Sequence, residues 1–316
     1  QPRMTDKAAL QWTTLDFANY WSVVEEDTPI LKCFSENSPS LEGLQKAYDT
    51  SWYSETASES VIMTPEQLYG FYFLSSRTDF AGKTIKLGAD IILNKGKATT
   101  WNAENAPENT WVPIGKFTGI FDGQGHTISG LYAKGYNSPT ALFVNTTKGC
   151  EIRNFKITNS YFEGKGVGGV ASVVSNGGAN LKQIYSDAII NVKGSWSGYA
   201  GGICSKLKSK SIIEECWFDG VIKNTGRNSG GIVDDVNRCE VQLSHCLFSG
   251  EIYSTWSVAI DNASQYYLSR TGGLVGRAVN EGARLVINDC LSSGNIVAEY
   301  VNQTGGVLGT AMEGSV

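Results

Sequence analysis

Short segments in which apolar and polar residues alternate recur along the chain beyond residue 60. In Cys216–Ile222 every second residue is apolar or glycine, which is the period of a β-strand. The same phrase, with a glycine four residues after the cysteine and an isoleucine two residues later, recurs at Cys246–Ile252 and Cys290–Ile296. In our alignment of an earlier, degenerate copy, the cysteine, phenylalanine and isoleucine positions are taken by Ser186, Ala188 and Val192.

A second phrase, two glycines followed by a branched apolar residue, is in phase with the first. Its second glycines are Gly169, Gly202, Gly231, Gly273 and Gly306, so that successive copies are 33, 29, 42 and 33 residues apart. A unit of about 30 residues with one apolar face cannot bury that face alone, whereas units stacked about 4.8 Å apart share a continuous interior. We therefore predict an all-β protein, a right-handed parallel β-helix, because parallel crossover connections are right-handed by default.

The beginning of this solenoid carries a helix signal. Thr64 is a favourable N-cap, Pro65 suits the first helical position, and Gln67 follows three residues after the cap. The spacing predicts a short helix that covers the open end of the first repeat, which a solenoid needs for solubility.

The recurring cysteines are predicted to stack inside the protein. Cys216, Cys246 and Cys290 occupy one phase of the repeat, where small apolar thiols fit a buried column. A disulfide between neighbouring repeats and metal ligation are the alternatives. The seven cysteines are odd in number and contain no Cys-x-x-Cys pair, and the chain has only 2 histidines, so we predict neither a metal site nor a cofactor.

Composition narrows the function further. The chain has 316 residues, 36 of them glycine, and Lys+Arg 26 against Asp+Glu 31 gives a net charge of −5. No basic stripe could neutralise phosphates, which excludes nucleic acid as an expected partner. The sequence contains no apolar run of about 18 residues, so we expect no transmembrane segment.

The glycine phrases resemble those of the GLUG-motif family of bacterial surface and adhesin-like proteins. The best matches are Gly272–Gly276 and Gly305–Gly309, whereas Gly202 and Gly231 begin copies that lack the final Val-Gly. Three flanking segments also resemble the family, and they are Thr64–Leu68, Phe80–Asp90, and Trp111–Gly115 through Phe121–Leu131.

This resemblance implies a domain organisation and a setting. Residues 61–316 are expected to form the GLUG-type β-helix domain, and residues 36–60 a linker. Leu15–Phe34 resembles the phrase that closes such a domain, so we expect residues 1–35 to end an upstream repeat unit. The implied setting is a secreted or cell-surface bacterial protein, with self-association through the solenoid ends as a further expectation.

Catalysis is the rival interpretation, because polysaccharide lyases and glycoside hydrolases also use parallel β-helices. Hydrolysis needs two carboxylates about 5–9.5 Å apart. Our alignment places Asp187 and Asp219 in different phases, and Asp234 and Asp235 on opposite faces of a strand. We therefore predict a protein that is not an enzyme but a structural or adhesive module, such as a stalk, an adhesin or a filament unit.

A row of aromatic residues is the predicted ligand site. Residues four positions after the strand-ending apolar residues include Trp196, Trp256 and Tyr300, with Tyr199 and Tyr266 nearby. Facing outward, they would form a flat surface on which sugar rings stack. The alternative is an aromatic column packed beneath the turns. Glycans, or host and cell-surface proteins, are the partners that this arrangement predicts.

Overall fold

The structure is a computed structural model that describes residues 21–22, 30–31, 48–102, 105–135, 138–147, 149–175, 177–193, 198–255, 269–299, 301 and 303–311. The chain divides into two compact units, Gln1–Tyr48 and Asp49–Val316. In the first unit, β1 (Trp21–Ser22) pairs antiparallel with β2 (Ile30–Leu31).

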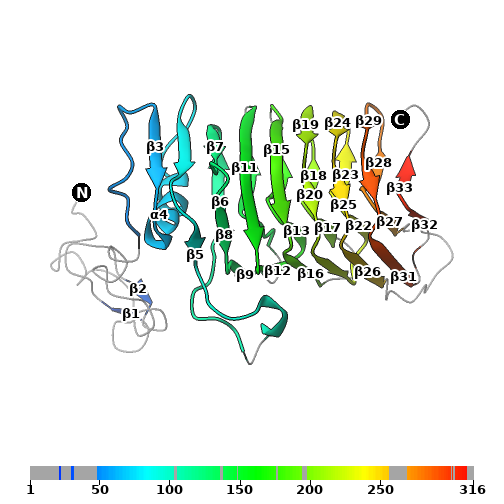
Figure 1. The fold of residues 1–316 in the computed structure, drawn as a ribbon, viewed down its shortest axis with the longest axis horizontal. Coiled ribbons are helices and arrows are strands. Elements are labelled where there is room, and N and C mark those ends of the chain that lie inside the picture. Colours follow the sequence, from blue (N-terminus) through cyan, green and yellow to red (C-terminus); the bar gives the residue numbers. More distant parts are fainter. Residues whose placement is uncertain are drawn as a thin grey trace. The chain divides into compact units, whose positions relative to one another are not determined.

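The second unit is built from short strands that pair in parallel with their counterparts in the next repeat (Figure 1). Its largest sheet follows the order β29 (Arg284–Asn288), β24 (Glu240–Ser244), β19 (Ser211–Glu214), β15 (Ala179–Ser186), β11 (Cys150–Thr158), β7 (Ile120–Asp122), β4 (Thr84–Leu87) and β3 (Glu59–Ile62). Short strands extend this sheet sideways, and they are β20 (Trp217–Phe218), β25 (Leu247–Phe248), β30 (Leu291–Ser292), β5 (Ile91–Ile92) and β8 (Thr127–Ser129).

Three further parallel sheets contain the other strands of this unit. The seven-stranded sheet comprises β33 (Leu308–Ala311), β28 (Val275–Val279), β23 (Val233–Asn237), β18 (Cys204–Leu207), β14 (Ala171–Val174), β10 (Phe143–Thr146) and β6 (Ile114–Phe117). The six-stranded sheet comprises β31 (Asn295–Glu299), β26 (Glu251–Thr255), β21 (Val221–Asn224), β16 (Ile189–Val192), β12 (Tyr161–Gly164) and β9 (Tyr132–Lys134). The five-stranded sheet comprises β13 (Gly166–Gly168), β17 (Tyr199–Gly201), β22 (Asn228–Gly230), β27 (Arg270–Gly272) and β32 (Gln303–Gly305).

The strands of this unit contribute buried side chains to one large hydrophobic cluster, so the prediction of a nearly all-β protein with stacked parallel repeats is confirmed. The predicted cysteine column is also present. Cys216 and Cys246 are buried, and the backbone N–H of Cys246 donates to Sγ of Cys290 at 3.3 Å. The six cysteines in the described part of the chain are free thiols, which agrees with the buried-thiol interpretation rather than with a disulfide between repeats.

The predicted helix is α4 (Pro65–Ser75), and its beginning has the expected cap. The backbone N–H of Gln67 donates to Oγ1 of Thr64 at 3.3 Å, and the Gln67 side chain in turn accepts from the N–H of Met63 at 2.7 Å. Phe71 of this helix enters the core, where its ring lies 5.2 Å from that of Phe80. A 3₁₀ turn, η1 (Ala98–Thr100), lies in the loop between β5 and β6.

The structure places the boundary between the two compact units at Tyr48 and Asp49. Residues 49–60 were predicted as part of a linker, yet Trp52 and Tyr53 pack against the core of the second unit. Their burial against this core explains why the linker prediction extends too far. Residues 36–47 of the predicted linker, and the predicted closing segment 1–35 apart from its two short strands, lie outside the described residues.

The register of the degenerate first copy differs from our alignment. Ser186 pairs with Phe218, and Ile190 pairs with Ile222, so this copy is displaced by two residues. A displacement of two keeps every side chain on its predicted face, and the alternation of apolar residues therefore cannot detect it.

Glycine is required where neighbouring repeats touch at the Gly-Gly corner. A Cβ atom on Gly231 would lie 2.1 Å from the carbonyl oxygen of Gly273 and 2.5 Å from the ring of Phe248. Both distances are far below van der Waals contact, and the carbonyl is fixed by the neighbouring repeat. The matching residue of the last copy, Gly306, has no atom within 4 Å of such a Cβ.

We expect Gly231→Ala to lower the free energy of unfolding by about 3 kcal/mol, because the added methyl overpacks a rigid backbone contact. Gly306→Ala is the matched control and should change it by less than about 0.5 kcal/mol. Urea unfolding followed by circular dichroism measures both. Equal effects of the two substitutions would contradict the close approach of the repeats.

Candidate functional site

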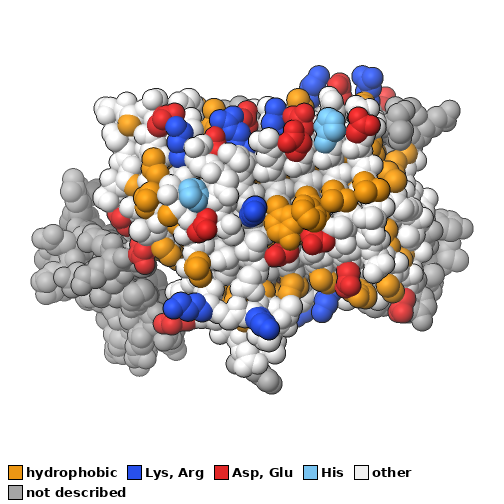
Figure 2. Space-filling view, in the orientation of Figure 1, with side chains coloured by type: hydrophobic (Ala, Val, Ile, Leu, Met, Phe, Trp, Pro, Cys, Tyr) orange, Lys and Arg blue, Asp and Glu red, His pale blue; other side chains and the backbone are white. Residues whose placement is uncertain are grey.

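An apolar stripe runs across the largest sheet on its outer face. Its members are Tyr185, Trp217, Leu247 and Leu291, which pair in register from one repeat to the next. Their chain neighbours Phe218 and Phe248 are buried in the core, so the stripe residues face outward by the alternation of a strand. Figure 2 shows a continuous band of hydrophobic side chains on this face, with acidic side chains beside it.

Trp217 is the centre of the stripe and is held in a fixed orientation. Its side chain is 40% exposed, and its ring packs edge-on against Tyr185 with 4.9 Å between the ring centroids. The indole N–H donates to Oγ of Ser249 at 2.7 Å, and the Ser249 hydroxyl donates to Oδ1 of Asp219 at 2.5 Å. A ring anchored at its edge keeps its orientation without losing conformational entropy when a ligand binds.

Two carboxylates follow the stripe along its side. Because Ser186 pairs with Phe218, the next residues, Asp187 and Asp219, stand in neighbouring repeats at the same phase. This corrects our prediction that they are out of register. Asp187 accepts a hydrogen bond from the backbone N–H of Asn159 at 2.7 Å. Burial raises the pKa of Asp187, the hydrogen bond from Asn159 lowers it in part, and the charge of Asp219 raises it further.

The chain bends just before each stripe residue at a non-glycine residue with positive φ. These residues are Gln183, Glu215, His245 and Asp289, with φ of 54°, 52°, 54° and 47°. Most side chains avoid this left-handed region, so the stacking of repeats must impose it. In the three later repeats the bend separates the long strands of the largest sheet from the short strands β20, β25 and β30, whereas Gln183 lies within β15, which also carries Tyr185.

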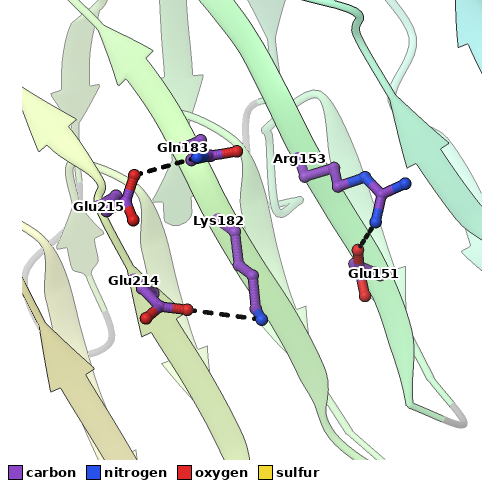
Figure 3. A pocket seen from close by; sticks show the side chains of 6 residues that line it. All are labelled: Glu151, Arg153, Lys182, Gln183, Glu214 and Glu215. Carbon is purple, nitrogen blue, oxygen red and sulfur yellow. Dashed lines mark hydrogen bonds and ion pairs between the residues drawn. The ribbon is translucent and has the colours of Figure 1, made fainter.

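A shallow cavity of about 340 Å³ beside the stripe is lined by three glutamates, an arginine, a lysine and a glutamine (Figure 3). Lys182 pairs with Glu214 at 3.4 Å, and Nε2 of Gln183 donates to Glu215 at 3.0 Å. Arg153 pairs with Glu151 and also with Asp122. Partly exposed pairs of this kind are worth about 0–1 kcal/mol each, and the three glutamates outnumber the two cations of the lining, so the cavity keeps a net negative charge.

Four of the five predicted ligand residues, Trp196, Trp256, Tyr266 and Tyr300, lie outside the described residues. Tyr199 is described, and it is half-buried on β17. The ammonium group of Lys206 lies 4.1 Å from the centroid of its ring. The sequence analysis missed Trp217 and Tyr185 as a pair, although both immediately precede an inward position of the repeated phrase.

The other acidic pair is enclosed. Asp234 and Asp235 are both fully buried. Asp235 accepts a hydrogen bond from Arg277 at 2.7 Å and pairs with Lys206 at 3.2 Å. Burial, followed by the charge of Asp235, holds the pKa of Asp234 well above its ordinary value. These two carboxylates are therefore enclosed within the fold, where a polysaccharide on the surface does not reach them.

Within the described ranges, no group of three or more His, Cys, Asp and Glu residues is arranged to hold a metal ion. No helix in the described part of the chain has the length and apolar character needed to cross a membrane.

Comparison with known proteins adds two likenesses. No protein-family model matches the chain. Over 153 residues, 48% of the chain, the sequence is 26% identical to halomucin from Haloquadratum walsbyi (strain DSM 16790 / HBSQ001), and the match spans 2% of that protein's length. The fold is similar to that of a candidate immunoglobulin A1 protease from Bacteroides ovatus, with a TM-score of 0.51, 18% identity, and coverage of 86% of this chain and 88% of that chain. The structural likeness concerns the fold alone.

The raised pKa of Asp187 predicts a pH-dependent effect of its removal. The folded chain binds this proton more tightly than the unfolded chain does, so the group lowers the free energy of unfolding as the pH rises from below 3.8 through its folded-state pKa. In Asp187→Asn the side-chain oxygen still accepts from Asn159, while the buried charge is removed.

We expect Asp187→Asn to be more stable than the parent at pH 7 and equally stable at pH 3, as measured by urea unfolding at both pH values. Asp289→Asn is the control, since the Asp289 side chain is 85% exposed. A gain that persists at pH 3 would argue against an electrostatic origin.

Proposed function

We propose that this chain is a non-catalytic structural or adhesive module of a cell-surface or extracellular protein, and that it binds glycan along the apolar stripe. The single observation that carries the proposal is the exposed Trp217 ring, fixed at its edge by Ser249. In this proposal the four sheets form a closed, right-handed solenoid, as expected for parallel crossovers.

The chemistry of the stripe suits a sugar. An exposed aromatic ring offers an apolar face to the C–H groups of a pyranose, while polar atoms at its rim accept hydrogen bonds from hydroxyl groups. Asp219 and Asp187 supply such acceptors beside Trp217 and Tyr185. Repeats about 4.8 Å apart continue the surface in one direction, which favours a linear polymer over a compact ligand.

The setting rests on other grounds. The Gly-Gly phrases support membership of the GLUG-motif family of surface proteins, which remains our proposal. Self-association through the solenoid ends stays a prediction.

We expect Trp217→Ala to weaken binding of the glycan at least tenfold, about 1.4 kcal/mol, because the stacking face is lost. Tyr253→Ala is the matched control, since Tyr253 is 39% exposed but lies on the six-stranded sheet. A glycan array identifies the ligand, and isothermal titration measures both variants. If the parent retains no glycan, or Trp217→Ala binds as well as the parent, the proposal is wrong.

One observation favours a second candidate, a glycoside hydrolase. Asp187 and Asp219 occupy the same position in neighbouring repeats, whose strands are about 4.8 Å apart, and retaining enzymes hold their two carboxyl groups about 5–5.5 Å apart. The raised pKa of Asp187 would suit the general acid, with Asp219 as the nucleophile. Against it, each carboxylate already has a partner in the fold, Asn159 for Asp187 and Ser249 for Asp219.

Release of reducing ends from a polysaccharide panel separates the two candidates. The adhesive module should release none above a heat-denatured control. A hydrolase should release them, and Asp187→Asn and Asp219→Asn should each reduce the rate by at least a hundredfold, since both carboxyl groups are needed.

A further inference from the structure

A second hollow, distinct from the apolar stripe, lies where the five-stranded and seven-stranded sheets meet. It has a volume of about 230 Å³. Its lining residues are Pro139, Lys165, Gly166, Ser172, Val173, Tyr199, Ser205, Lys206 and Lys208.

The hollow arises from a change in side-chain size between two stacked repeats. Gly166 pairs with Tyr199, and Val173 pairs with Lys206. The small residues of the first repeat therefore leave a depression that is bounded by the long side chains of the second. Ser172 keeps the floor in place, because its hydroxyl donates to the carbonyl oxygen of Gly166 at 2.8 Å.

The residues that line this hollow carry an excess of positive charge. Three of the residues that line it are lysines, and none of the described lining residues is acidic. Lys206 pairs with the buried carboxylate of Asp235, whereas Lys165 and Lys208 make no ion pair with any described residue. The cavity of Figure 3 is the opposite case, since three glutamates there face an arginine and a lysine.

Lys206 is held in place while the other two amines remain available. Its ammonium group lies 3.2 Å from Oδ2 of Asp235 and 4.1 Å from the centroid of the Tyr199 ring. Arg277 donates to the same carboxylate oxygen at 2.7 Å, so Asp235 is shared between two cations. The positive charge of Lys206 is thus only partly offset within the fold.

We propose that this hollow binds an oxyanion substituent of a glycan, a sulfate ester or a carboxylate. Lys165 and Lys208 contact the oxyanion, Lys206 adds a fixed positive charge, and Tyr199 forms the wall against which the sugar ring rests. The inference does not depend on the apolar stripe, whose flanking groups are carboxylates and repel an anionic ligand.

The test compares sulfated and neutral dextran oligosaccharides of equal length, with inorganic sulfate as a third probe, by isothermal titration at low and at physiological salt. We expect the parent to bind the sulfated oligosaccharide at least tenfold more tightly than the neutral one. The double variant Lys165→Ala/Lys208→Ala should lose at least tenfold of that affinity, and Tyr199→Ala should lose affinity for the oligosaccharide but not for inorganic sulfate.

Lys116→Ala is the matched control, because Lys116 is an exposed lysine of the same seven-stranded sheet outside the hollow. It should change the affinity less than twofold. Equal losses in Lys116→Ala and the double variant would show attraction to surface charge and overturn the site, as would a parent that does not distinguish the two oligosaccharides. Binding of sulfate and oligosaccharide with equal affinity would overturn the glycan as the source of the oxyanion. Trp217→Ala should leave all these affinities unchanged. The experiment therefore tests oxyanion binding in this hollow independently of glycan binding along the apolar stripe.

Discussion

Parallel backbone pairing between successive repeats, at a fixed register, is the constraint on which the rest of the structure depends. A single register determines both the interior and the surface. It aligns Phe218 above Phe248 in the core, and it aligns Trp217 above Leu247 on the outside. Because the repeats are only about 4.8 Å apart, the corner between two sheets admits glycine alone, as the backbone approach at Gly231 shows. The core, the corners and the outer stripe are therefore consequences of one hydrogen-bonding pattern.

Two kinds of feature were predictable from the sequence. They are those that depend on the alternation of inward and outward residues along a strand, and those that depend on a local signal. The cysteine column follows from alternation, and the cap of α4 follows from Thr64 and Gln67. The absolute register of the degenerate copy was not predictable, because a displacement of two preserves parity. That displacement concealed the pairing of Tyr185 with Trp217 and of Asp187 with Asp219. The left-handed residues Gln183 and Glu215 carry no glycine signal, because their conformation is imposed by the neighbouring repeats.

The outer face carries three surfaces of different chemistry on one backbone. The stripe around Trp217 is apolar with carboxylates at its edge, and the cavity around Lys182 is charged, with more carboxylates than cations. The hollow beside Tyr199 is basic and has two lysines without an acidic partner among the described residues. Outward residues can differ in this way because the core restricts only the inward positions. A likeness of fold to another protein with 18% identity therefore says little about what these surfaces bind.

The close contact at the Gly-Gly corner has a consequence for how such a chain can diverge. A side chain introduced on Gly202 would meet the carbonyl of Gly231, and one on Gly231 would meet that of Gly273. Tolerance to mutation is therefore shared by the equivalent positions of successive repeats. Positions at the Gly-Gly corner accept few substitutions, whereas positions on the outer faces accept many. Gene duplication that adds or removes whole repeats keeps equivalent positions aligned. Gain or loss of one residue within a strand shifts the register of that strand against both neighbouring repeats.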